Sequence, residues 1–216
     1  MPLDQKTILA AVKEAKEKSE KRKFNQSIEL VLNLKDVDMK SAEGKIQEIV
    51  ELPYSPAKPN KICVIASGEL ALKARKVNAD HVVEKAELEG LAGKKRELRK
   101  LANDYDFFIA EAPLMKSVGR ILGPILGPRG KMPIAVPPSA DIASLLNKHR
   151  KTIIVRSRSQ PMIQCRIGTE DMKEEELTEN IQTILRVLEG KLKKGMKNIK
   201  FAIIKTSMGT PVKIKS

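Results

Sequence analysis

Residues near both ends of the chain alternate between apolar and polar, as strands with one buried face do. From 27 to 35 every second residue is aliphatic and most residues between are polar, and the alternation returns at 162–167. Segments 46–52, 153–157 and 199–205 are also apolar-rich and predict further strands, although Glu48 interrupts the apolar side of the first of them.

Two segments have a helical period instead. Asp4 is placed as the N-cap of a first helix, whose inward positions are Ile8, Val12 and Ala15. Asp171 is placed as the N-cap of a second helix, with Glu174 completing a capping box and Gly195 as C-cap. Its apolar stripe consists of Leu177, Ile181, Ile184, Leu185, Leu188 and Leu192. Half-buried strands with two amphipathic helices predict an α+β sheet domain with its helices on one face.

The middle of the chain follows another pattern. Residues 62–66 and 107–110 are short, continuous apolar runs, which predict strands covered on both faces, and 81–84 predicts a third strand. Helices are predicted at 68–77, 87–104, 114–122 and 141–150, the second of them long and basic. Alternating strands and helices indicate a small parallel sheet with helices on both faces.

These two patterns divide the chain. Residues 53–60 contain three prolines and read as a linker. We predict a two-domain α/β protein in which residues 1–59 and 151–216 form a discontinuous α+β domain and residues 60–150 are inserted into it.

Glycine and proline recur throughout Val118–Pro138, which predicts an ordered, partly buried loop displaying Arg120, Arg129 and Lys131. A phosphate-binding loop would need glycine at Ile125 and serine or threonine at Met132. A nucleotide-using enzyme is therefore only weakly supported. Two interpretations stay open for Arg129 and Lys131: they contact RNA phosphates, or their loop caps the core of the smaller domain.

Charge narrows the class of partner. Lys and Arg number 41 against 27 Asp and Glu, a formal net charge of +14, and this excess favours a polyanion such as nucleic acid. Both predicted domains are basic, so charge does not say which one binds.

The sequence contains few candidate catalytic or metal-binding residues. Cys63 and Cys165 lie in apolar runs and predict small buried residues in a reducing compartment, while His81 and His149 stand alone and indicate no metal site. No catalytic set or cofactor motif is found, so the protein is predicted not to be an enzyme. Without a secretory signal or a long apolar run, it is expected to be cytoplasmic, with no membrane contact.

The segment from Thr206 to Gly209 combines two hydroxyls, a methionine and a glycine. Hydroxyls suit the 2′-OH and phosphate groups of RNA, Met208 can pack on a sugar or base, and Gly209 lets the backbone approach a ribose. The alternative is a plain turn between strands.

Three motifs, in this order, carry a resemblance: FNQSIEL at 24–30, LGPRGKMP at 126–133 and TSMG at 206–209. The chain resembles the family of the large-subunit ribosomal protein numbered one, in particular its archaeal branch. The resemblance implies a Rossmann-like, three-layer inserted domain on two hinge strands. It also implies binding to the mobile stalk of large-subunit rRNA near the tRNA exit site, a part in release of deacylated tRNA, and repression through the protein's own mRNA.

The resemblance also implies which residues bind RNA. They would lie on the discontinuous domain, on the polar sides of its strands and in the last motif: Gln26, Ser27, Glu29, Asn33, Lys45, Arg158, Gln164, Arg166, Gly168, Thr206, Ser207, Met208 and Gly209. Arg129 and Lys131 would form a secondary RNA contact or a structural loop. One departure is Thr210, which stands before Pro211 where members often have proline directly after the Met-Gly pair. The implied partners are the rRNA stalk, the protein's own mRNA and exit-site tRNA, and the free protein is expected to be a monomer.

Overall fold

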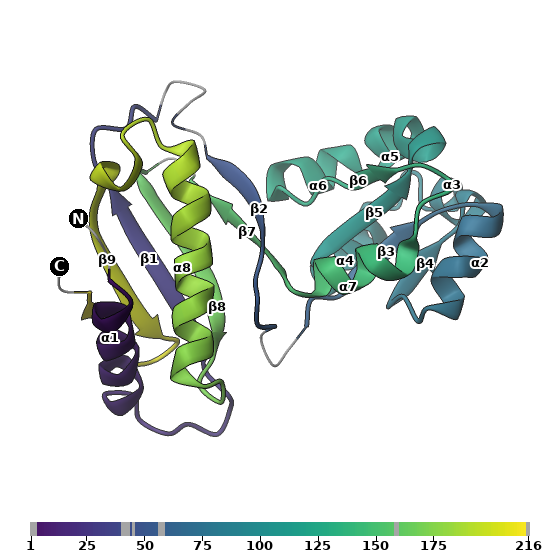
Figure 1. Cartoon of the computed structure of the whole chain (residues 1–216). Helices are drawn as coiled ribbons and strands as arrows, with labels where there is room; N and C mark the ends of the chain where they lie inside the picture. The colour runs from purple at the N-terminus through teal and green to yellow at the C-terminus, as the bar shows by residue number, and fades with distance from the viewer. Residues whose placement is uncertain (1–3, 40–43, 45, 56–58, 158–159, 215–216) are drawn as a thin grey trace. The chain divides into compact units, whose positions relative to one another are not determined.

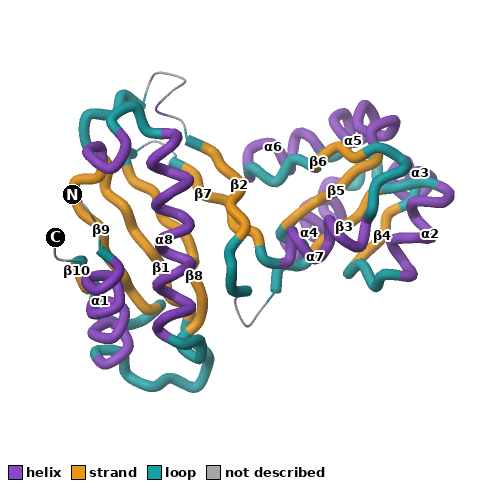
Figure 2. Tube along the Cα trace, viewed as in Figure 1, coloured by secondary structure: helices purple, strands orange, loops and turns teal. Residues whose placement is uncertain are grey.

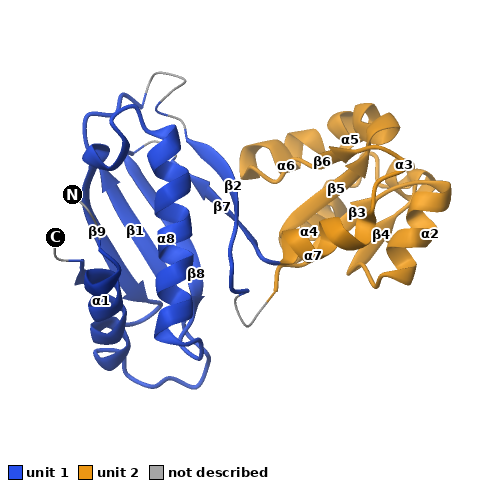
Figure 3. Ribbon diagram, in the orientation of Figure 1, with its two compact units in different colours: residues 1–58, 151–216 blue, residues 59–150 orange. Residues whose placement is uncertain are grey.

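A computed structural model describes residues 4–39, 44, 46–55, 59–157 and 160–214 of the chain. Its contacts divide the chain into unit 1, residues 1–58 with 151–216, and unit 2, residues 59–150 (Figure 3). Pro59, expected in the first domain, therefore lies in unit 2. Both units mix helices and strands, which confirms the predicted α/β class.

Unit 1 is built on a four-stranded antiparallel sheet of order β10-β9-β1-β8, with β9, β1 and β8 labelled in Figure 1 and β10 in Figure 2. The strands are β1 (Ser27–Leu34), β8 (Met162–Thr169), β9 (Ile199–Thr206) and β10 (Val212–Lys213). Every second residue of β1 is buried, as the alternation predicted. Helices α1 (Gln5–Glu17) and α8 (Glu174–Lys191) lie on the same side of this sheet (Figure 2). The opposite side of the sheet, called the open side below, carries the half-buried residues Ser27, Glu29, Val31 and Asn33 of β1.

The helix ends differ in detail from the prediction. The six residues of the α8 stripe are buried as expected. However, α8 begins after Lys173, whose backbone N–H donates to the Glu176 carboxylate at 3.1 Å, so Asp171 is not its N-cap. The Asp171 side chain is instead bonded to the amide of Asn25. Gly195, with φ of 54°, opens the 3₁₀ turn Gly195–Asn198 instead of capping α8.

The first helix begins after Asp4, but the Asp4 side chain does not cap it. The Thr7 hydroxyl donates to the Asp4 carbonyl at 2.8 Å instead.

Strands β2 (Gln47–Glu51) and β7 (Thr152–Arg156) form a separate antiparallel ribbon in unit 1. Glu48, the polar residue on its apolar side, forms an ion pair with Lys191 of α8 at 2.9 Å. This ion pair explains how the strand tolerates the interruption in its pattern. Just beyond the ribbon, the Leu52 N–H donates to the Lys151 carbonyl at 3.1 Å.

Unit 2 contains a parallel sheet of order β4-β3-β5-β6. Its strands are β3 (Ile62–Ile65), β4 (His81–Val83), β5 (Phe107–Glu111) and β6 (Ile134–Val136). All residues of β3 and β5 are buried, as the continuous apolar runs predicted. Its α-helices are α2 (Gly68–Lys76), α3 (Lys85–Gly90), α4 (Lys95–Asp104), α5 (Met115–Ile121), α6 (Gly123–Arg129) and α7 (Ile142–Arg150). Helix α2 contacts α7, whereas α3 contacts α5 and α4 contacts α6, so two helical layers are present.

Two predictions for this unit are wrong. The single helix at 87–104 is two helices, α3 and α4, because Gly93 between them has φ of 83°. The stretch Val118–Pro138 is not one loop, since it contains α6 and β6. Pro124 lies in the first turn of α6, where a backbone donor has no helical partner, and Gly130 ends the helix with φ of 68°.

Candidate RNA-binding surface

Three segments that are far apart in the sequence meet at one end of the unit 1 sheet. Ser27 of β1 pairs with Thr169 of β8, and Ile28 pairs with Thr206 of β9. Beyond β9, the Ser207 N–H donates to the Ser27 carbonyl at 3.0 Å, and the Ser27 N–H donates to the Ser207 hydroxyl at 3.2 Å. The first and last motifs of the sequence therefore form one surface.

Residues 206–209 form a tight turn, in which the Gly209 N–H donates to the Thr206 carbonyl at 3.3 Å. A Cβ atom added to Gly209 would lie 2.1 Å from the Thr206 hydroxyl oxygen, so a larger residue does not fit without a shift. Met208 projects from the turn with 63% of its surface exposed. The Lys205 ammonium donates to the Ser207 carbonyl at 3.2 Å, which places a cation beside the turn.

Three of the predicted site residues lie inside the protein. Gln26 is fully buried, and the buried Thr206 donates its hydroxyl to Ser19 at 3.0 Å. Gly168 is packed against α8, where a Cβ would lie 2.5 Å from Leu177. This burial excludes direct contact of the Gln26 and Thr206 side chains with RNA, and Gly168 has no side chain to make one. For these three residues, the prediction of direct contact with RNA is therefore corrected to a buried position in unit 1.

The open side of the sheet carries Glu29, Gln164 and Arg166. Glu29 lies opposite Arg166 in the β-ladder, and the Gln164 amide donates to the Glu29 carboxylate at 2.8 Å. Asn33 lies farther along β1, opposite Met162. Of the remaining predicted residues, Lys45 and Arg158 lie outside the residues that the structure describes.

The sequence interpretation missed the contribution of β9 to this open side. Lys205 lies opposite Glu29, and Ile203 lies opposite Val31 at the centre of the sheet. Phe201 lies farther along, with the Lys213 ammonium 5.4 Å from its ring centroid. In the structure Ala202 and Ile204 are buried, whereas Phe201, Ile203 and Lys205 are half-buried. No such signal is present in the sequence, because residues 201–204 form a continuous apolar run.

Both cysteines are buried, as predicted. Burial raises the pKa of Cys63 to about 12 and that of Cys165 to about 12, so both thiols are neutral near physiological pH. The structure thus gives neither thiol a nucleophilic character.

Arg129 and Lys131 are engaged at the C-terminal end of α4. The Lys131 ammonium donates to the carbonyls of Ala102 at 3.1 Å and Tyr105 at 2.7 Å, and the Arg129 guanidinium donates to the side chain of Asn103. A cation at this place satisfies carbonyls that have no helical partner. This geometry favours the interpretation that the loop of Arg129 and Lys131 caps the core of unit 2 over the interpretation that the two side chains contact RNA.

A nucleotide site in unit 2 is also disfavoured. In a parallel sheet such a site lies at the carboxyl ends of neighbouring strands where the strand order reverses, here β3 and β5. The buried Glu111 carboxylate accepts hydrogen bonds there from the Ser67 N–H at 2.9 Å and the Ser67 hydroxyl at 2.7 Å. A carboxylate at the start of α2 occupies the place of a phosphate and would repel one.

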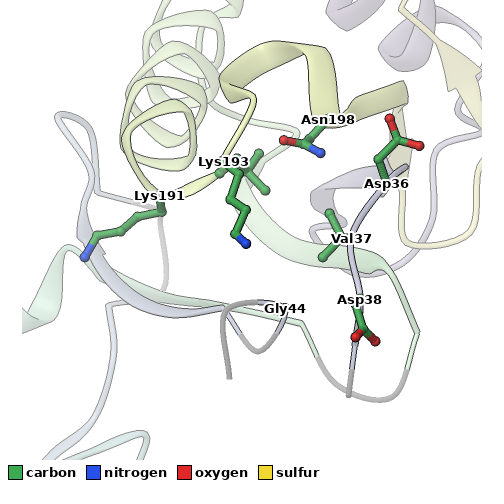
Figure 4. Close-up of a pocket in the computed structure, with 8 residues that line it drawn as sticks. Asp36, Val37, Asp38, Gly44, Lys191, Lys193 and Asn198 are labelled. Carbon is green, nitrogen blue, oxygen red and sulfur yellow. The ribbon is translucent and has the colours of Figure 1, made fainter. Parts of the chain in front are cut away.

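A pocket of about 140 Å³ lies at the other end of the unit 1 sheet, beyond Leu34 (Figure 4). It is lined by Asp36, Val37, Asp38, Gly44, Lys191, Leu192, Lys193 and Asn198. Acidic and basic side chains both line it, so the pocket has no single charge that would select an anionic or a cationic ligand. Within the described residues, no cluster of three metal-ligating side chains and no helix long and apolar enough to cross a bilayer is found.

Comparison with known proteins gives a consistent result over nearly the whole chain. The sequence model of the Ribosomal protein L1p/L10e family matches residues 14–210. The large ribosomal subunit protein uL1 of Hyperthermus butylicus is 47% identical over 95% of this chain and 94% of its own length. That of Pyrococcus abyssi is 46% identical over 100% and 98%, and that of Methanothermobacter thermautotrophicus is 47% identical over 97% and 99%.

Proposed function

Because the chain belongs to the ribosomal protein L1p/L10e family, we propose that it binds the mobile stalk of large-subunit rRNA through the Met208 turn and the open sheet face of unit 1. The family makes it a structural constituent of the large ribosomal subunit and not an enzyme. The discontinuous unit is then the rRNA-binding domain.

The main support for this proposal is the exposed Met208 side chain in a turn whose backbone is held by hydrogen bonds. A long apolar side chain that is 63% exposed is costly to leave in water, yet the surrounding hydrogen bonds hold its backbone in one conformation. Such a rigid apolar group beside hydroxyls fits the wide, shallow minor groove of A-form RNA. Lys205 and Arg166 supply positive charge for phosphates, while Glu29 can accept a hydrogen bond from a 2′-OH.

The test is titration of a stalk rRNA fragment with wild-type protein and with Met208→Ala at two salt concentrations. We expect Met208→Ala to lose about 1–3 kcal/mol of binding free energy, as when one stacking or packing contact is removed. The salt dependence should not change, because the residue is uncharged.

Met132→Ala is the matched control, since this methionine is also exposed, at 45%, but lies in unit 2. If Met208→Ala binds as tightly as the wild type, the turn is only structural and the proposed surface is wrong.

We include two further ligands in the proposal. A single recognition surface for stalk RNA would also bind a similar structure in the protein's own mRNA, and thereby repress its translation. Competition between rRNA and mRNA fragments for one site would support this idea, and independent binding of both would contradict it. The position of the stalk beside the exit site would bring the protein to deacylated tRNA and involve it in tRNA release.

A further inference from the structure

We propose that Gln26 is the positioning residue of the RNA-binding surface: it fixes the backbone of Met208 and so holds that side chain in place before RNA arrives. The inference rests on the proposed function of the Met208 turn. Gln26 itself cannot contact RNA, since its exposed fraction is 0%.

The side-chain amide of Gln26 joins the turn to the rest of unit 1. Its oxygen accepts the Met208 N–H at 3.1 Å. Its nitrogen lies 2.9 Å from the Ser19 hydroxyl, 2.9 Å from the Glu20 carbonyl and 3.3 Å from the Glu170 carboxylate. One amide therefore connects the residues after α1, the residues after β8 and the turn after β9.

The backbone of Gln26 is fixed as firmly as its side chain. The Gln26 N–H donates to the Glu170 carboxylate at 3.1 Å, and its carbonyl accepts the Glu170 N–H at 3.0 Å. Ser19 adds a second connection, because its hydroxyl oxygen also accepts the hydrogen bond of Thr206 at 3.0 Å. Further hydrogen bonds thus hold both the backbone of Gln26 and Ser19, the acceptor of its side-chain amide.

Glutamine meets the chemical requirement of this position. The site needs an acceptor for the Met208 N–H and a donor toward the oxygens of Ser19 and Glu20, and an amide supplies both. A carboxylate would lose the donor and would face the Glu170 carboxylate. A methionine has a similar length but makes neither bond, so it leaves the Met208 N–H without this partner.

Preorganisation links this network to binding. A flexible turn would have to be ordered when RNA binds, and the entropy lost would weaken affinity even if every contact to RNA were kept. Gln26 should therefore act on affinity only through Met208, and its removal should leave the salt dependence of binding unchanged because no charge is altered.

The experiment compares Gln26→Met with the control Asn180→Leu in the full chain. Asn180 is another fully buried amide of unit 1, which bonds the backbone of Tyr54 at 3.1 and 3.0 Å and that of Ile167 at 2.9 Å, away from the turn. Gln26→Met should weaken binding of the stalk rRNA fragment about tenfold, the equivalent of one hydrogen bond, and speed hydrogen exchange of the Met208 amide. Asn180→Leu should lower the melting temperature and change neither quantity.

A double variant separates positioning from general destabilisation. If Gln26 acts through Met208, Gln26→Met adds little to the loss already caused by Met208→Ala. Full additivity of the two losses, or a Gln26→Met variant with wild-type affinity and wild-type exchange of the Met208 amide, would overturn the inference. The two failures are distinguishable. If Met208→Ala alone weakens binding, the proposed function stands even though the inference about Gln26 is wrong. If Met208→Ala binds with wild-type affinity, the proposed function itself is wrong.

Ser19→Ala provides a milder variant in case Gln26→Met does not fold. It removes the shared acceptor of Gln26 and Thr206, and should weaken binding about threefold with faster exchange of the Met208 amide. Unchanged affinity and exchange in Ser19→Ala would contradict the network.

Discussion

At the scale of single residues, neighbours decide which polar side chains are available for RNA. Lys131 is a cation in the most conspicuous motif of the chain, yet its ammonium is used by the carbonyls of Ala102 and Tyr105. Gln26 is inconspicuous in the sequence and lies at the centre of a network of hydrogen bonds. Residue type alone does not distinguish these two roles.

Lys131→Met tests the structural role of the Gly/Pro motif. We expect unit 2 to lose about 1–2 kcal/mol of stability, because two carbonyls lose a charged donor, while affinity for stalk rRNA stays unchanged. Stability can be measured through alkylation of Cys63, which is buried with a pKa raised to about 12 and should react only when unit 2 opens.

Lys100→Met is the control for Lys131→Met, since Lys100 is an exposed lysine of the same helix α4. A loss of RNA affinity in Lys131→Met that Lys100→Met does not share would instead assign Lys131 to RNA binding.

At the scale of elements, periodicity predicted the strands correctly, whereas the limits of the helices depend on the backbone conformation of single residues. Alternation predicted β1 and β8 because one side of each strand faces the core. The same kind of pattern could not reveal the break between α3 and α4, since the spacing of Leu91, Leu98 and Leu101 fits the inward face of one continuous helix. The break depends on Gly93, which adopts φ of 83°.

Gly93→Ala should destabilise unit 2 by about 1 kcal/mol, because a residue with a Cβ rarely adopts this left-handed conformation. Gly90→Ala is the matched control: its Cβ would meet no atom within 4 Å, and alanine favours the helix α3. The stability of unit 2 in both variants can be measured by denaturant titration, with alkylation of Cys63 as the signal for unfolding. Equal or greater stability of Gly93→Ala would mean that residues 87–104 favour a continuous helix.

At the scale of the whole molecule, the net charge of +14 and the division into two units set the expected behaviour. If about six phosphates are neutralised, affinity should fall about a thousandfold between 50 and 200 mM salt. The proposed surface lies wholly in unit 1, so unit 2 should not be needed for recognition of the stalk fragment.

Replacing residues 56–150 by a Gly-Ser linker tests this expectation. The linker begins after Ser55, which keeps the hydrogen bonds between Tyr54 and Asn180, and it rejoins the chain at Lys151, whose carbonyl is 3.1 Å from the Leu52 N–H. We expect affinity for stalk rRNA within about threefold of the full chain, because the proposed surface is retained.

Cys165 of unit 1 should stay unreactive to alkylation in this variant, which would show that the shortened chain is folded. A folded variant that no longer binds would place part of the recognition surface in unit 2.

Linear patterns were enough to predict the strands with alternating faces, the buried strands of the parallel sheet, the α8 stripe and the family. These features are repeated along the chain or encoded by neighbouring residues, so a linear pattern contains them. It could not locate α6, because proline usually breaks a helix interior, yet α6 has Pro124 in its first turn and also contains Pro128 near its end.

Which polar residues are exposed and which are buried became known from the packed structure alone. Gln26 and Thr206 belong to motifs with polar positions, yet each is buried and bonded to a partner distant in sequence. The Gln26–Met208 hydrogen bond spans 182 positions along the chain. Whether a polar group faces water or a partner depends on where such distant segments meet, and that is a property of the packed chain, which no local pattern records.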